Sequence, residues 1–138
     1  MQKTKLKGYV KTLIINTTRV LKDEDFQRRI WFRREGPEVS SYIDTGVFFV
    51  ANTKQILDDP ENEEYLGKET YALLKKLYDL LIEHIDRTED RIDPYLLTEE
   101  ELLNDPKWQD IQTLAGNVEE KFKEFLERYD DEQKHSTN

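Results

Sequence analysis

The segment 70–87, TYALLKKLYDLLIEHIDR, constrains the fold more than any other part of the chain. Its apolar residues recur at alternating steps of three and four, as one stripe of an α-helix requires. That stripe consists of Tyr71, Leu74, Tyr78, Leu81 and Ile85, and it is widened by Leu73, Leu77, Leu80 and Ile82. An apolar face of this breadth has to be covered on more than one side. We therefore expect a central helix against which the other helices pack.

The composition favours one all-α domain. A chain of 138 residues corresponds to about one domain, and 36% hydrophobic content with six Phe, seven Tyr and two Trp is enough for a core. Only five glycines and four prolines occur, fewer turn residues than an all-β chain needs. We predict a single-domain bundle of about five helices, spanning 1–138, with an ordered core over about 5–129 and a disordered acidic C-terminal tail.

Two helices are predicted in the N-terminal third, after a loose basic end at 1–5. The first runs from about 5 to 21, although its β-branched residues leave a strand at 10–15 as the alternative. Asp23 is a suitable N-cap for a second, short helix that ends before Gly36. A strand at 29–34 is the alternative there, because the sequence Ile-Trp-Phe is common in strands.

The next helix is predicted from Ser40 or Ser41 to the Asp-Asp-Pro sequence at 58–60. It carries two overlapping apolar stripes. The first is Tyr42, Phe49 and Ile56, and the second is Ile43, Val47, Val50 and Leu57. Gly46 interrupts this helix at a cost of about 1 kcal/mol relative to alanine, and a glycine in such a place often permits a close helix approach.

The C-terminal half is predicted to contain three helices. An acidic connector at 61–67 leads to the central helix at 68–87, and a polar link at 88–94 follows it. Thr98 with Glu101 matches a capping box for a short helix at 99–103. Proline after Asp105 is the preferred start of a helix, and the last helix has a regular apolar stripe that we expect to pack on the central helix. This stripe is Trp108, Ile111, Ala115, Val118, Phe122, Phe125 and Tyr129.

Several classes of function are disfavoured. The absence of cysteine excludes disulfides, thiolate metal sites and cysteine nucleophiles. The longest unbroken apolar run is five residues, Val47–Ala51, which is too short to span a membrane, and no signal peptide is visible. We expect a cytoplasmic protein that does not bind membranes.

The sequence contains no catalytic or metal-binding motif. His84 has no carboxylate or second histidine three or four residues away, and His135 lies in the predicted tail. The acidic clusters at 58–64 and 86–93 lack the glycine and the spacing of a calcium loop. We predict no metal, no cofactor and no enzymatic activity. An enzyme would need a pocket that holds His84 with a carboxylate in hydrogen-bond reach.

The net charge of −9 is unevenly distributed. Residues 1–36 contain ten basic and four acidic residues, whereas 37–138 contain eleven basic and twenty-six acidic residues. Either a basic segment projects from an acidic body as a binding arm, or it packs on that body and is neutralised. The sequence alone leaves both arrangements open.

Two groups of residues are candidate binding sites. The basic-aromatic patch, which could bind a protein or nucleic acid, is Arg28, Arg29, Trp31, Arg33 and Arg34. Alternatively Trp31 belongs to the core and the arginines pair with carboxylates, and the acidic remainder of the chain would repel nucleic acid. The acidic candidate, which could cover a basic partner protein, is Asp58, Asp59, Glu61, Glu63, Glu64, Asp86, Glu89 and Asp90.

Two stretches together resemble a class of small, acidic, uncharacterised bacterial proteins. One is GPEVSSY at 36–42 with the helix that ends ILDDP at 56–60, and the other is NDPKW at 104–108 with the apolar residues that follow. Some proteins of this class are similar to the immunity proteins that accompany secreted toxins. The resemblance covers roughly residues 23–126 and implies a helical protein that binds another protein without catalysis.

Overall fold

The computed structural model describes residues 1–89 and 97–136, and these form helices and no strand. Two helices contain π-helical segments: α1 (Lys3–Leu13) continues through η1 (Ile14–Thr18) into α2 (Arg19–Leu21), and α3 (Glu24–Phe26) continues into η2 (Gln27–Phe32). The others are α4 (Tyr42–Leu57), α5 (Glu61–Leu66), α6 (Lys68–Glu89), α7 (Glu99–Leu103) and α8 (Pro106–Ser136). Among the described residues, five continuous helices have seven or more residues, which confirms the predicted all-α bundle.

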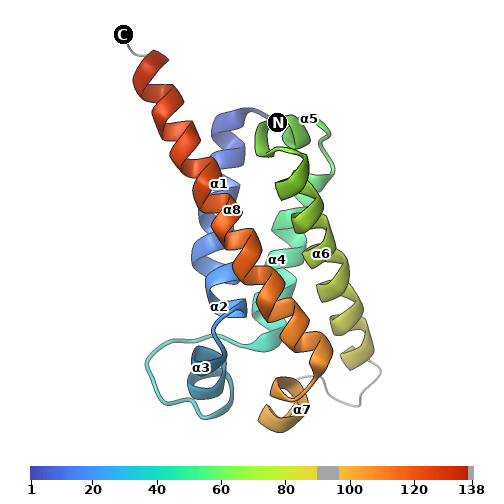
Figure 1. Cartoon of the computed structure of the whole chain (residues 1–138). Helices are drawn as coiled ribbons and strands as arrows, with labels where there is room; N and C mark the ends of the chain where they lie inside the picture. Colours follow the sequence, from blue (N-terminus) through green and yellow to red (C-terminus); the bar gives the residue numbers. More distant parts are fainter. Residues whose placement is uncertain (90–96, 137–138) are drawn as a thin grey trace.

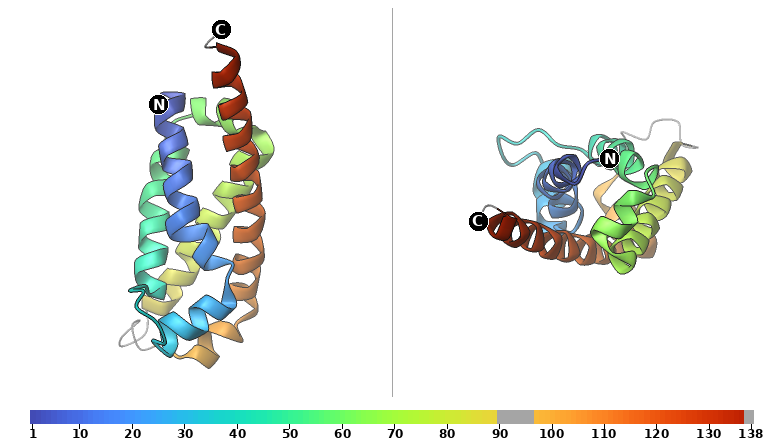
Figure 2. Two further views of the ribbon diagram at one scale, coloured as in Figure 1. Left: turned by 90° about the vertical axis from the view of Figure 1, so that its left-hand side faces the viewer. Right: turned by 90° about the horizontal axis from the view of Figure 1, so that it is seen from above.

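The long helices lie side by side along one axis (Figure 1). The most extensive packing is between α6 and α8 and between α4 and α6, so α6 is the central helix that its sequence predicts. The helix α8 runs diagonally across α6 and the α1–α2 helix (Figures 1 and 2). The short helix α5 lies at one end of the bundle near the N-terminus, and α3 and α7 lie at the opposite end.

Local capping places the starts of three helices where the sequence predicts them. The Asp23 carboxylate accepts a hydrogen bond from the Phe26 N–H at 3.0 Å, and the Ser41 hydroxyl accepts one from the Asp44 N–H at 3.1 Å. Thr98 and Glu101 form the complete capping box at the start of α7. Each cap satisfies backbone N–H groups that have no partner within the helix.

The core is formed by the apolar stripes of the long helices. The first stripe of α4 is buried, as are the four apolar residues at the centre of α6 and α8 that we expected to meet: Leu74, Leu81, Val118 and Phe122. Gly46 allows α4 and α6 to approach closely, because a Cβ atom at this position would lie 2.9 Å from the Ile85 Cδ1 atom.

The helices predicted over 10–15 and from Asp23 onward are present, and the strand alternatives at 10–15 and 29–34 do not occur, because both segments carry apolar side chains that pack into one helical core. Two other expectations about local structure are wrong. The acidic connector at 61–67 contains the helix α5, in which Asn62 and Leu66 are buried. The N-terminal segment is not loose, since α1 begins at Lys3 and the Met1 amino group pairs with the Asp59 carboxylate.

The last helix is longer than predicted. The sequence places the end of the ordered core near 129, but α8 continues to Ser136. Ion pairs join its final turns to α1, from Lys3 to Glu132 and from Lys7 to Asp130, the latter at 3.3 Å. Polar residues in this region are therefore held by charges on a neighbouring helix, which a search for apolar periodicity does not detect. The predicted polar link at 88–94 falls mainly outside the described residues.

Within the described residues, no helix combines the length and the apolar character needed to cross a membrane.

The close approach of α4 and α6 at Gly46 predicts how a larger side chain there changes stability. Replacing Gly46 with leucine inserts a side chain between α4 and α6 and should lower the free energy of unfolding by about 1–3 kcal/mol. Chemical denaturation would measure this change. Gly8 in α1 is the matched control, because nothing lies within 4 Å of a Cβ atom there. Gly8→Leu should therefore be neutral or stabilising, and an equal loss in both variants would contradict the close-packing argument.

Candidate functional site

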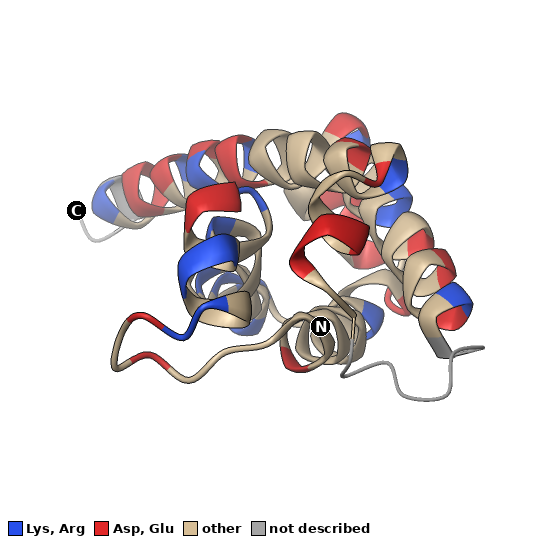
Figure 3. Ribbon diagram, turned by 90° about the horizontal axis from the view of Figure 1, so that it is seen from below, with Lys and Arg blue, Asp and Glu red and all other residues tan. Residues whose placement is uncertain are grey.

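The basic-aromatic patch is largely used inside the molecule. Trp31 is 8% exposed, and its Nε1–H donates to the Ser40 hydroxyl at 2.9 Å. Both Arg28 and Arg33 pair with Glu99, at 2.8 and 3.2 Å. These contacts bring η2 to the acidic helix α7 at the same end of the bundle (Figure 3).

The remaining members of the patch, Arg29 and Arg34, lie on η2 and in the loop after it. Arg29 pairs with Asp25 at 3.0 Å on its own helix. Arg34 adopts a left-handed conformation with φ of 52° in the loop after η2. Trp31 is therefore part of the core, and three of the four arginines pair within the chain while their side chains stay 39–52% exposed.

Carboxylates of the acidic part also pair with Lys3, Lys7 and Lys22 of the N-terminal region. Glu119 is 3% exposed and forms two ion pairs. One carboxylate oxygen lies 2.9 Å from Lys22 Nζ, and the other lies 3.1 Å from Lys123 Nζ. Although burial acts to raise it, these two lysines hold the pKa of Glu119 below its usual value. With the pairs from Lys3 and Lys7, this contact fixes α1 and α2 against α8.

The acidic candidate residues separate into two groups at opposite ends of α6. Asp58, Asp59, Glu61, Glu63 and Glu64 lie around α5, before the first turn of α6, whereas Asp86 lies in its last turns. A helix of 22 residues is about 33 Å long at 1.5 Å per residue. The side chain of Glu89 and the whole of Asp90 fall outside the described residues.

The members near α5 differ in how much of their charge is compensated. Asp58 pairs with Lys54 at 2.6 Å, and the Met1 amino group pairs with Asp59 and approaches Glu61 to 3.7 Å. The amino group, as the main cause, lowers the pKa of Asp59. Among the described residues, neither Glu63, Glu64 nor Asp86 has an ion pair, and Glu64 and Asp86 are exposed.

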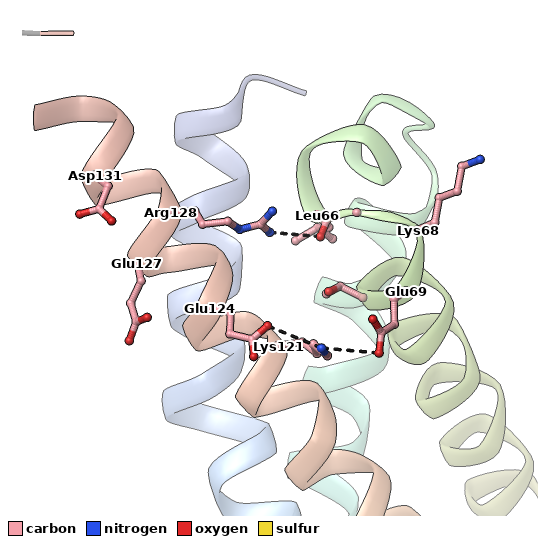
Figure 4. A pocket seen from close by; sticks show the side chains of 10 residues that line it. Leu66, Lys68, Glu69, Lys121, Glu124, Glu127, Arg128 and Asp131 are labelled. Carbon is pink, nitrogen blue, oxygen red and sulfur yellow. Dashed lines mark hydrogen bonds and ion pairs between the residues drawn. The ribbon is translucent and has the colours of Figure 1, made fainter. Parts of the chain in front are cut away.

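An open groove separates the start of α6 from α8 near the α5 end (Figure 4). Its volume is about 520 Å³. Lys121 lies between Glu69 and Glu124, at 3.5 and 3.6 Å, and Arg128 donates to the Leu66 carbonyl at 3.4 Å. The cations that point into this groove are thus already bound to groups on its walls.

His84 lies in a buried polar network at the other end of the bundle. The Tyr42 hydroxyl is 2.6 Å from His84 Nδ1, and His84 Nε2 is 3.0 Å from Asp105 Oδ2. A carboxylate can only accept, so Nε2 carries the proton and Nδ1 accepts from the Tyr42 O–H. The other Asp105 oxygen accepts from the Lys107 N–H at 2.9 Å, which caps α8.

Burial controls the protonation of this network. It lowers the pKa of His84 against the opposing effect of Asp105, and it raises the pKa of Tyr42 to about 12. Although burial acts to raise the pKa of Asp105, the hydrogen bonds from Lys107 and His84 hold it below its usual value. At neutral pH the network therefore contains a neutral tyrosine, a neutral histidine and one carboxylate.

Aromatic rings enclose His84. The centroid of Trp108 lies 5.3 Å from that of His84 and 5.4 Å from that of Tyr42, and Trp31 lies 5.9 Å from Trp108. We call His84, Tyr42, Trp31 and Trp108 the aromatic cluster. It joins η2, α4, α6 and α8, and its contacts span sequence distances that no local pattern reveals.

A small depression of about 180 Å³ opens beside His84. It is lined by His84, Arg87, Thr88, Leu97, Glu101 and Asp105. This is the geometry that we required of an enzyme, a pocket with His84 and a carboxylate in reach. However, both ring nitrogens of His84 and both oxygens of Asp105 already have hydrogen-bond partners. The network thus joins α4, α6 and α8.

A second, more apolar groove of about 340 Å³ lies between α4 and α6. Its lining is Val47, Val50, Ala51, Ile82, Ile85 and Asp86. Val47 is 54% exposed, and Phe48 beside it is 37% exposed. Two members of the second apolar stripe of α4, Val47 and Val50, therefore line this groove at the surface of the bundle.

Comparison of the chain with protein-family models, with curated proteins and with solved structures finds no match. The resemblance to acidic bacterial proteins and to immunity proteins stays a prediction. Within the described residues, no group of three or more potential ligands is placed to hold a metal ion.

The buried His84 makes the stability of the protein depend on pH. The pKa of His84 is lowered from 6.5 in the folded chain, so the unfolded chain binds its proton first as the pH falls. The contribution of His84 to the free energy of unfolding is fully present above pH 6.5. Below pH 6.5 the free energy of unfolding should decrease, by at most about 1.4 kcal/mol per pH unit from this residue. Urea denaturation between pH 7.5 and 5.5 would measure the slope.

The variant His84→Phe separates this effect from others. At pH 7.5 it should cost about 1–3 kcal/mol, because the buried Tyr42 hydroxyl loses its acceptor. It should also flatten the pH dependence above pH 5.5, whereas His135→Gln should leave the slope intact. A slope unchanged by His84→Phe would show that another group causes it.

Proposed function

We propose that this chain is a non-enzymatic, cytoplasmic protein-binding module of the immunity or antitoxin kind, which covers a basic partner protein. The partner lies lengthwise along the side of the bundle formed by α4, α5 and α6. Its basic groups face the carboxylates at the two ends of α6, and its apolar groups face the groove between them.

One observation supports this proposal above all others. Six of the ten basic residues in 1–36 pair with carboxylates within the chain, whereas Glu63, Glu64 and Asp86 are not paired among the described residues. The chain carries a net charge of −9. The excess negative charge is therefore available at the surface, where it speeds the approach of a cationic partner.

The dimensions of this side suit a single partner. A standard interface buries about 800 Å² on each protein, which is a patch roughly 30 Å across. The length of α6, about 33 Å, brings both acidic ends within one such patch. The hydrogen-bonded state of His84 and Asp105 is consistent with a role in stability and with binding without catalysis.

Charge reversal tests this proposal on the purified products of the genes that flank the coding sequence. Binding to one of these proteins should weaken at least tenfold between 50 and 300 mM salt, because salt screens exposed charges. The triple variant Glu63→Lys, Glu64→Lys, Asp86→Lys should weaken binding at least as much at low salt. Isothermal titration calorimetry would measure both effects.

The control variant makes the same change in net charge elsewhere. Asp110, Glu120 and Glu127 are exposed on α8 and have no ion pair among the described residues. Their replacement by lysine should weaken binding by less than threefold. Equal losses in the two triple variants, or binding that does not depend on salt, would contradict a contact along α4, α5 and α6.

A further inference from the structure

The groove between α4 and α6 is a largely apolar surface that the bundle leaves open. Ile43, Val47 and Val50 follow one another along α4 at helical spacing. Val47 and Val50 line the groove, and Ile82 and Ile85 line it from α6. Ile43, Val50 and Ile82 are half-buried and Val47 is exposed, so the groove has an apolar floor with an accessible edge. Apolar residues that recur along two adjacent helices match the side chains of a third helix laid between them.

The charges around the groove indicate what can occupy it. Lys54 in α4 and Lys75 in α6 each pair with an aspartate one turn further along their own helix, at 2.6 and 3.6 Å. Asp86 lines the groove, and Asp44 is exposed one turn before Val47; neither has an ion pair among the described residues. The uncompensated charge at this surface is therefore negative.

This charge argues against a second copy of the chain as the occupant. A second copy would bring the same net charge of −9 and the same unpaired Asp44 and Asp86 to the interface, because a symmetric dimer uses the same patch on both copies. A cationic helix instead places its apolar residues on Val47 and Ile82 and its lysines or arginines beside Asp44 and Asp86.

We propose that the groove between α4 and α6 binds an amphipathic α-helix of a partner protein, with apolar residues at i, i+3 or i+4, and i+7 and with basic residues along their edges. This inference rests on the proposed function and specifies the element of the partner that is recognised. The groove supplies the apolar contact, and Asp86 selects a positive charge at its end.

The probe is a synthetic 18-residue helical peptide with leucines at i, i+3, i+4 and i+7 and lysines at the flanking positions. It should bind the full chain with micromolar affinity and shift the backbone amide signals of α4 and α6 in NMR spectra. A peptide with the same leucines and with glutamates in place of the lysines should bind at least tenfold more weakly. A third peptide contains the same leucines and lysines in scrambled order, so that it has no apolar stripe. It should also bind at least tenfold more weakly.

Three variants of the protein decide the site. Val47→Gln with Ile82→Gln changes accessible side chains and should weaken binding of the leucine-lysine peptide at least tenfold, and Asp86→Lys should weaken it at least threefold. Ile15→Gln is the matched control, because Ile15 is also apolar and 59% exposed but lies in η1. It should leave the affinity unchanged.

The inference is overturned if the peptide does not bind at 1 mM, if its signals map to other helices, or if the Val47 and Ile82 variants bind it normally. A concentration-dependent dimer that these variants abolish would show that a second copy occupies the groove. The same variants distinguish this inference from the proposed function. One outcome is that a flanking gene product loses affinity for the Glu63, Glu64 and Asp86 variant but binds the Val47 and Ile82 variant normally. That result supports the proposed function and overturns the groove as the contact.

Discussion

The hydrogen bonds of Gln27 connect three parts of the structure that share no local sequence pattern. Its side-chain nitrogen donates to the carbonyls of Val20 and Leu21, at 2.9 and 2.8 Å, where α2 ends. Its oxygen accepts from Trp108 Nε1 at 3.0 Å and from Gln112 at 2.9 Å. One buried amide thus donates to two carbonyls at the end of a helix, where carbonyls lack partners within the helix, and it also fixes the indole of Trp108. The position of Trp108 then determines where the aromatic cluster and His84 can lie.

Features of the fold that depend on neighbouring residues could be predicted from the sequence. The caps at Asp23, Ser41 and Thr98 each join residues three apart, so their hydrogen bonds could be inferred from spacing alone. The helical period likewise identified α6 and α8 as packing partners. Contacts across long distances could not be inferred in this way. Asp105 was predicted as a helix start, but its bond to His84 crosses 21 residues and depends on how α6 and α8 are placed.

The two π-helical segments show a different limit of sequence reasoning. The run Ile14–Thr18 is rich in β-branched residues, which suggested a strand as the alternative. In the structure these residues stay helical, with Thr17 and Thr18 fully buried between neighbouring helices. Tertiary packing therefore overrides a low helix propensity. The same reasoning applies to η2, where burial of Ile30 and Trp31 outweighs their preference for strands.

The open groove follows from the way α4 uses its two apolar stripes. A helix with two overlapping stripes can bury both only if neighbours cover about half of its circumference. Here α6 and α1 cover the stripe of Tyr42, Phe49 and Ile56, and the close approach at Gly46 draws α6 toward that side. The longest helix, α8, packs across α6 and the α1–α2 helix and does not reach the outer side of α4. The second stripe, around Val47, is consequently left at the surface, and a bundle of this topology would need one more helix to cover it.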